Sequence, residues 1–193
     1  MKPKQGQTIW ITGLSGAGKS TLARALSERL RARHRSVIQL DGDELREVFG
    51  TASSATVAAH NHDRAARLTL ALQYARLCHV LSEQGHTVII ATISLFREVH
   101  QWNRAHLANY YEVYLKVPLT ELRRRDPKGI YQRFDAGELC HVAGLDIAID
   151  EPKAADWVVE HDPETSIESI AAGLLARLEA PTGNPTKPTG PRS

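Results

Sequence analysis

The segment from Gly13 to Thr21 carries the residue types that bind the phosphates of a nucleotide. It reads GLSGAGKST and fits the phosphate-loop pattern G-x-x-x-x-G-K-[ST]. Its glycines let the backbone curl so that several N–H groups converge on phosphate oxygens, and the positive end of the following helix adds to this attraction. Lys19 is suited to bridge the β- and γ-phosphates, and the Ser20 hydroxyl to be a Mg²⁺ ligand. The segment therefore predicts that ATP and Mg²⁺ are bound by Gly13, Leu14, Ser15, Gly16, Ala17, Gly18, Lys19, Ser20 and Thr21.

A second polar cluster, Leu40–Arg46 (LDGDELR), follows an apolar run that is typical of a buried strand. Because ligands of parallel α/β sheets lie outside the carboxyl ends of the strands, we expect Asp41 and Asp43 beside the phosphate loop. One carboxylate could hold a Mg²⁺ water while the other accepts the proton of an attacking hydroxyl. We assign Asp41 to the metal site together with Ser20, and slightly favour it over Asp43 as the base. Arg46 suits an anionic acceptor. The turn has a structural alternative, in which Asp43 caps a helix.

Five short apolar runs alternate with helical patterns along the chain. The predicted strands are Thr8–Thr12, Ser36–Leu40, Thr87–Thr92, Tyr111–Val117 and Trp157–Glu160. Apolar spacing predicts helices over Lys19–Arg33, Glu44–Phe49, Asp63–Glu83, Arg97–Ala108, Leu119–Arg125 and Ser166–Leu178. Continuous apolar strands without polar alternation are typical of a parallel sheet covered on both faces. The expected fold is a three-layer α/β/α phosphate-loop kinase domain with a mostly parallel five-stranded sheet.

Three stretches lack this periodicity. Asp126–Asp150 combines glycine and charge, and we expect it to be a long loop or lid. Pro181–Ser193 holds four of the nine prolines and is predicted to be a disordered tail. Thr51–His62 is rich in Ala, Ser and Thr and receives no assignment. The predicted kinase domain therefore covers residues 1–180, with the lid at about 126–150.

Length and composition exclude several classes of protein. The chain has 193 residues, 42% of them hydrophobic, which suffices for one packed core. A net charge of +2 is too small to indicate nucleic-acid binding. The longest apolar stretch, Thr87–Phe96, is far shorter than a membrane span, and no signal peptide is evident. Cys78 and Cys140 are too few for a disulfide framework. We expect a cytoplasmic protein without nucleic-acid or membrane partners, and its small size favours a small-molecule kinase over a GTPase or a motor.

Four segments occur in the order and with the spacing of one kinase family. They are Gly13–Thr21, Leu40–Arg46, Ile93-Ser94 and Arg125–Leu139 (RDPKGIYQRFDAGEL). The last is the most specific, because no general requirement of a phosphate loop demands its Asp-Pro-Lys-Gly-Ile-Tyr. Together they resemble the adenylylsulfate (APS) kinase family. The resemblance implies transfer of the γ-phosphoryl of ATP to the 3′-hydroxyl of APS, giving 3′-phosphoadenylyl sulfate in sulfate assimilation, and it suggests a homodimer.

The resemblance also implies roles for residues outside the phosphate loop. Ser94 matches a serine recorded in the family as a phosphoserine intermediate, and it is a candidate catalytic residue. Since in-line transfer needs no covalent stop, a substrate contact would suffice there. Phe96 could stack on a base or belong to the core, and Arg97 matches a family arginine. Lys128 and Arg133 in the predicted lid could clamp phosphates or form a solvated basic face, so the candidate substrate-binding residues are Asp43, Arg46, Phe96, Arg97, Lys128 and Arg133.

The half of the pattern that contacts the acceptor departs from the family. Where APS kinases typically carry Asp-Arg-x-Glu-Asn-x-x-Arg, this chain has Asp63-Arg64-Ala65-Ala66-Arg67-Leu68-Thr69, without the Glu-Asn pair. Trp102-Asn103-Arg104 also differs from the usual sequence. Relatives with Asp-Gly-Asp-Glu-(Leu/Ile)-Arg and Trp-Asn-Arg look like cytidine diphosphoramidate kinases. APS is therefore the first expected acceptor, cytidine diphosphoramidate the alternative, and a non-catalytic nucleotide-binding regulator the remote third possibility.

Overall fold

The structure, a computed structural model, describes residues 6–49 and 64–180. Its five-stranded sheet has the order β2-β3-β1-β4-β5, and every neighbouring pair is parallel. The strands are β1 (Gln7–Thr12), β2 (Val37–Asp41), β3 (Thr87–Ala91), β4 (Tyr110–Lys116) and β5 (Trp157–Glu160). The three-layer α/β/α fold expected from the sequence is confirmed. Thr51–His62 and the predicted tail lie outside the described residues.

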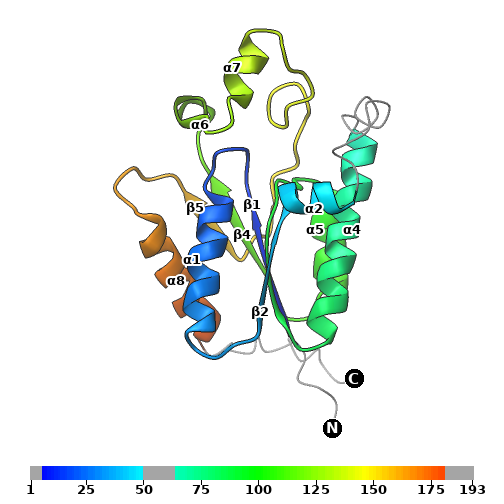
Figure 1. Ribbon diagram of the computed structural model, residues 1–193, viewed down its shortest axis with the longest axis vertical. Coiled ribbons are helices and arrows are strands. Elements are labelled where there is room, and N and C mark those ends of the chain that lie inside the picture. The colour runs from blue at the N-terminus through cyan, green and yellow to red at the C-terminus, as the bar shows by residue number, and fades with distance from the viewer. Residues whose placement is uncertain (1–5, 50–63, 181–193) are drawn as a thin grey trace, which may run out of the picture.

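Helices cover both faces of the sheet (Figure 1). Two of them, α1 (Lys19–Arg31) and α8 (Ile167–Glu179), pack together on one face. The other face is covered by α2 (Gly42–Val48), α4 (Arg64–Glu83) and α5 (Arg97–His106). None of the helices in the described ranges is long and apolar enough to cross a membrane.

Alternation along β1 divides the core into two parts. Ile9 and Ile11 belong to the cluster under α1 and α8, whereas Trp10 belongs to the cluster under α4 and α5. All three side chains are fully buried. Successive side chains of a strand point to opposite faces, so a continuous apolar run is needed where both faces are covered. The sequence pattern of β1 is thus a direct consequence of its central place in the sheet.

The predicted lid, residues 126–150, follows α6 (Leu119–Arg125) and contains α7 (Ile130–Asp135), and Figure 1 shows both helices above the sheet, beyond the carboxyl ends of the strands. The expectation of a long loop was wrong for α7. Gly129 precedes that helix with φ of 63°, and the Asp126 carboxylate accepts a hydrogen bond from the backbone N–H of Gln132 at 3.0 Å. Tyr131 is 1% exposed. Local capping and one buried side chain hold a helix too short to show a periodic pattern.

Candidate active site

The phosphate loop joins β1 to α1 in a backbone conformation that requires glycine. Gly13 has φ of 152°, and a Cβ there would lie 2.7 Å from the carbonyl oxygen of Leu115. Gly18, the residue before α1, has φ of 97°. L side chains rarely adopt such angles, so the sequence pattern is needed for this turn. The Lys19 ammonium donates a hydrogen bond to the carbonyl of Leu14 at 2.8 Å, which holds it over the loop.

The Lys19 ammonium is perturbed by its surroundings. Burial and the nearby charge of Lys128 lower the pKa of Lys19 to about 8, against the opposing attraction of Asp43 and Asp41. Desolvation and like charge both disfavour a protonated amine. Because the pKa stays near 8, Lys19 is still mostly charged at neutral pH, and a phosphate group beside it would favour the charged form further.

Asp41 connects the acidic turn to the phosphate loop. Its Oδ2 accepts a hydrogen bond from the Ser20 hydroxyl at 2.5 Å, and its Oδ1 accepts one from the backbone N–H of Asp43 at 2.9 Å. Asp41 is thus the N-cap of α2. The alternative in which Asp43 caps the helix was wrong, because Asp41 is the extended residue before it and Asp43 already lies in its first turn.

Asp43 connects the acidic turn to the lid. Its carboxylate forms ion pairs with Arg46, at 2.9 Å, and with Lys128 of the lid. Burial alone would raise the pKa of Asp43, but the hydrogen bond from Lys128 and the charge of Arg46 outweigh it and hold the pKa below its ordinary value. Asp43 is therefore ionised near neutral pH. The two carboxylates divide their contacts, with Asp41 toward Ser20 and Asp43 toward Lys128 and Arg46.

The lid also contacts the phosphate loop directly. The Tyr131 hydroxyl donates a hydrogen bond to the carbonyl of Ser15 at 3.0 Å. The neighbouring loop residue, Leu14, packs so closely on Gly144 that a Cβ at Gly144 would lie 2.9 Å from its side chain. Residues of the predicted lid, which the sequence groups only by composition, therefore contact two adjacent residues of the phosphate loop.

A cavity of about 390 Å³ lies beside this chain of contacts, and we call it the α4–lid cavity. Its wall is shared by α2, α4, the loop after β3 and the lid, together with Ser15 of the phosphate loop. Its polar and aromatic side chains include Arg46, Arg67, Tyr74, Ser94, Phe96 and His141. Three of them, Arg46, Ser94 and Phe96, are candidates from the sequence.

Ser94 and Phe96 occupy a tight turn after β3. Ser94 is buried, has φ of 29°, and its hydroxyl lies 2.8 Å from that of Thr92. Phe96 packs in the core under α4 and α5, with the guanidinium of Arg64 over its ring at 5.3 Å. The two alternatives for Phe96 are therefore compatible, because it packs in the core and also forms part of the cavity wall.

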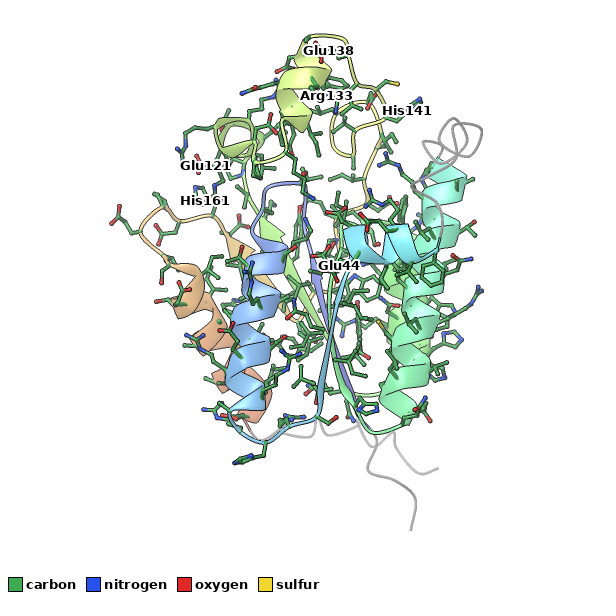
Figure 2. The ribbon with its side chains drawn as sticks, in the orientation of Figure 1. Glu44, Glu121, Arg133, Glu138, His141 and His161 are labelled. Carbon is green, nitrogen blue, oxygen red and sulfur yellow. The ribbon has the colours of Figure 1, made fainter. Side chains whose placement is uncertain are left out.

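Two other candidates lie elsewhere. Arg97 is exposed and contributes its backbone N–H, which donates to the Asp150 carboxylate at 3.2 Å. Arg133 lies on α7 and pairs with Glu138 at 3.8 Å, far above the sheet in Figure 2. Neither side chain is part of the cavity wall. Arg133 fits the solvated basic face that was its alternative.

The Trp102-Asn103-Arg104 segment has a structural role. Asn103 is fully buried and donates to the Tyr110 hydroxyl at 3.2 Å. Arg104 pairs with Asp156 at 2.7 Å and lies over the Tyr110 ring. This departure from the family pattern therefore holds α5 against β4 and the segment after the lid, and it lies outside the cavity wall.

Sequence reasoning did not single out Arg67 and Tyr74 as site residues. Both come from α4 and form part of the cavity wall. The Tyr74 hydroxyl donates to the carbonyl of Gly42 at 3.2 Å, and Arg67 donates to the carbonyl of His141 at 2.5 Å. Helical periodicity alone marks Tyr74 as core. The signal for Arg67 was its position in the stretch that departs from the family pattern.

Comparisons with known proteins cover nearly the whole described chain. The model of the adenylylsulphate kinase family matches residues 5–160. The cytidine diphosphoramidate kinase of Campylobacter jejuni is 39% identical over 170 residues, which cover 88% of this chain and 95% of that protein. The adenylyl-sulfate kinase of Paraburkholderia xenovorans is 38% identical over 182 residues, 92% of this chain and 96% of that protein.

Solved structures agree with these matches. The Mycobacterium tuberculosis APS kinase CysC, in complex with AMPPNP and APS, aligns with a TM-score of 0.82 and 31% identity over 92% of this chain and all of that one. Shikimate kinase from Acinetobacter baumannii shares the fold at a TM-score of 0.58 over 90% of this chain and 93% of that one, with 15% identity. The chain is a P-loop kinase and belongs to the adenylylsulphate kinase family.

Proposed function

We propose that this kinase transfers the γ-phosphoryl of ATP to a ribose hydroxyl of a nucleotide that carries a further anionic group, with adenylyl sulfate as the first acceptor. One observation carries the proposal. A chain of contacts runs from the phosphate loop through Ser20, Asp41 and Asp43 to Arg46, and Arg46 forms part of the cavity wall. A nucleotide in the α4–lid cavity would therefore lie next to the phosphates of ATP.

The donor end suits ATP with Mg²⁺. The Ser20 hydroxyl and the Asp41 carboxylate meet at 2.5 Å, and both are hard oxygen donors of the kind that Mg²⁺ prefers. Mg²⁺ usually keeps several waters and takes one or two protein ligands beside the phosphates. Ser20 would then bind the ion and Asp41 would hold it directly or through water. When bound, Mg²⁺ offsets the negative charge that accumulates on the phosphates.

The transfer itself needs positioning more than covalent chemistry. A ribose oxygen forms a bond to the γ-phosphorus while the bond from that phosphorus to the bridging oxygen of ADP breaks. Asp43, which pairs with Arg46 of the cavity wall, is ionised and would orient the hydroxyl and accept its proton. This assignment reverses the preference for Asp41 as the base, because both oxygens of Asp41 already accept hydrogen bonds. Ser94 is assigned to substrate contact.

A second acceptor, cytidine diphosphoramidate, is favoured by a specific observation. Ala66 and Arg67 lie in the stretch without the family's Glu-Asn pair, and both form part of the cavity wall. The departure therefore falls on the wall of the cavity that would hold the acceptor. The Campylobacter jejuni kinase is 39% identical to this chain, and the aligned residues cover 95% of that protein.

The test measures initial rates with purified enzyme, ATP and Mg²⁺, and with adenylyl sulfate or cytidine diphosphoramidate in separate reactions. We expect one ADP for each phosphorylated nucleotide. Asp43→Asn should lose turnover while retaining ATP binding. Binding of ATP without turnover of either nucleotide would contradict the proposal and favour the non-catalytic regulator.

Assembly and location remain proposals as well. We propose a homodimer on the resemblance to the family. We propose a cytoplasmic location because Cys78 and Cys140 are both free, as is usual in a reducing compartment. Light scattering at micromolar concentration should give twice the mass of the chain.

A further inference from the structure

Two arginines are the fully charged side chains of the α4–lid cavity. Arg46 comes from α2 and Arg67 from α4, and no Asp or Glu is among the described residues that form the wall. The rest of the wall is mostly apolar, including Ala66, Leu70 and Ile147. A cavity with this composition favours a ligand with an apolar or aromatic body and a negatively charged end.

The two arginines differ in their partners. Arg46 has a carboxylate partner, since it pairs with Asp43 at 2.9 Å. Among the described residues, Arg67 makes one hydrogen bond, from Nη2 to the carbonyl of His141 at 2.5 Å, and pairs with no carboxylate. A guanidinium has five N–H donors in a fixed fork, so most donors of Arg67 have no acceptor in this part of the protein.

The surroundings make this arrangement costly without an anion. Arg67 is half-buried, and burial together with the positive charge of Arg46 lowers the pKa of Arg67. Asp146 offers some opposing attraction, but it lies beyond salt-bridge distance and accepts hydrogen bonds from the backbone of His141 and Val142. Buried charges are usually paired, so a half-buried cation facing a cavity without carboxylates indicates an anionic ligand.

We propose that Arg67 is a specificity-determining residue that binds the distal anionic group of the acceptor nucleotide. The guanidinium fork suits the oxygens of a sulfate, phosphate or phosphoramidate group. Through the hydrogen bond to His141, the same side chain holds the lid segment that closes the cavity, and Figure 2 shows His141 on the lid loop beside α7. The inference rests on the proposed function, because it assigns the α4–lid cavity to the acceptor.

The experiment is a binding cycle that removes the arginine and the distal group separately. Calorimetric titrations are made on protein saturated with AMPPNP and Mg²⁺. They compare the affinity for adenylyl sulfate with that for AMP, and the affinity for cytidine diphosphoramidate with that for CMP. Arg67→Gln removes the charge, and Arg76→Gln on the exposed side of α4 is the matched control. We expect Arg67→Gln to lower the affinity for the nucleotide that carries the distal group by about tenfold or more, which is the scale of a charged hydrogen bond. The affinity for the corresponding monophosphate should fall by less than about twofold. Arg67→Lys should recover part of the loss.

Three outcomes would overturn the inference. In the first, Arg67→Gln lowers the affinity equally for the nucleotide with the distal group and for its monophosphate. In the second, Arg67→Gln lowers neither affinity. In the third, the wild-type protein binds neither adenylyl sulfate nor cytidine diphosphoramidate. Failure of the proposed function is distinguishable. If the selectivity for the distal group depends on Arg67 but no phosphorylated product forms, the reaction is wrong and the anion site stands. If product forms and Arg67→Gln keeps the selectivity, the reaction stands and the inference is wrong.

Discussion

The donor and acceptor halves of the site are built in different ways. The donor half, Gly13–Thr21 with Asp41, consists of residues that are close in sequence to strand ends, and its contacts depend on backbone geometry. The half that we propose for the acceptor is the wall of the α4–lid cavity, formed by α2, α4, the turn after β3 and the lid, which meet only in the fold. A change in α4 can alter the wall of the cavity without changing a residue of the phosphate loop. The comparison explains how one scaffold can serve different nucleotides.

The largest effect is expected at Lys19. Lys19→Met removes the cation that would stabilise charge on the transferred phosphoryl, and we expect turnover to fall by about a thousandfold or more. Steady-state rates at saturating ATP measure this loss. Lys153→Met, at an exposed position, is the control and should retain wild-type rates. A loss below tenfold at Lys19 would contradict the assignment of the donor half.

Asp43 lies where the two halves meet. General-base catalysis is worth at least about a hundredfold, so Asp43→Asn should lower kcat by about that factor. The affinity for ATP should change little, because Asp41, which contacts Ser20, is the carboxylate that we propose for the metal site. Calorimetry with AMPPNP checks binding, and Asp135→Asn, which alters a carboxylate elsewhere in the lid, is the control. If Asp41→Asn lowered kcat without changing the Mg²⁺ requirement, and Asp43→Asn did not lower kcat, Asp41 would be the base and Asp43 the metal residue.

The donor half should respond to pH through Lys19. The pKa of Lys19 is lowered to about 8, and the charged form is the one that binds phosphate. Affinity for ATP should therefore be constant below the pKa and fall as the pH rises through it, by about tenfold at pH 9. Titrations at several pH values measure the profile. The arginine of Lys19→Arg keeps its charge throughout this pH range, so the affinity of that variant for ATP should not change with pH. A wild-type affinity that does not change with pH would contradict the expectation.

The smallest effect is expected where the lid contacts the phosphate loop. Tyr131→Phe removes the hydrogen bond to the carbonyl of Ser15, which should cost about 1 kcal/mol of unfolding free energy. Urea denaturation measures this cost. Tyr111→Phe is the matched control, because its hydroxyl makes no hydrogen bond within the described residues. If both variants lowered the unfolding free energy equally, the hydrogen bond from Tyr131 to Ser15 would contribute nothing to stability.

The same division decides how much could be predicted from sequence. The strands, the phosphate loop and the acidic turn follow from local rules, because glycine conformations and apolar runs depend on near neighbours. The contact between Tyr131 of α7 and Ser15 and the contact between Arg67 and His141 join residues far apart in the chain. The capping role of Asp41 was missed because Asp41 and Asp43 are equally good caps by residue type, and only the backbone shows which one precedes the helix.

Candidates from the lid and the turn after β3 show the same limit. Lys128 reaches the acidic turn, whereas Arg133 lies on the outer part of α7 and Arg97 points to solvent. A charged residue in a predicted lid has no periodic pattern that would show which way it faces. The family pattern names the positions, and the fold decides which of them reach the cavity.

In the proposed reaction, phosphates bound on the loop lie beside a nucleotide in the α4–lid cavity. One reaction tests it most directly, with equimolar adenylyl sulfate and cytidine diphosphoramidate competing for ATP and Mg²⁺. Phosphorus NMR of the products should show a new phosphomonoester on a ribose hydroxyl and one ADP for each, and the product ratio gives the preferred acceptor. ADP and inorganic phosphate as the sole products, with both nucleotides unchanged, would contradict the claim.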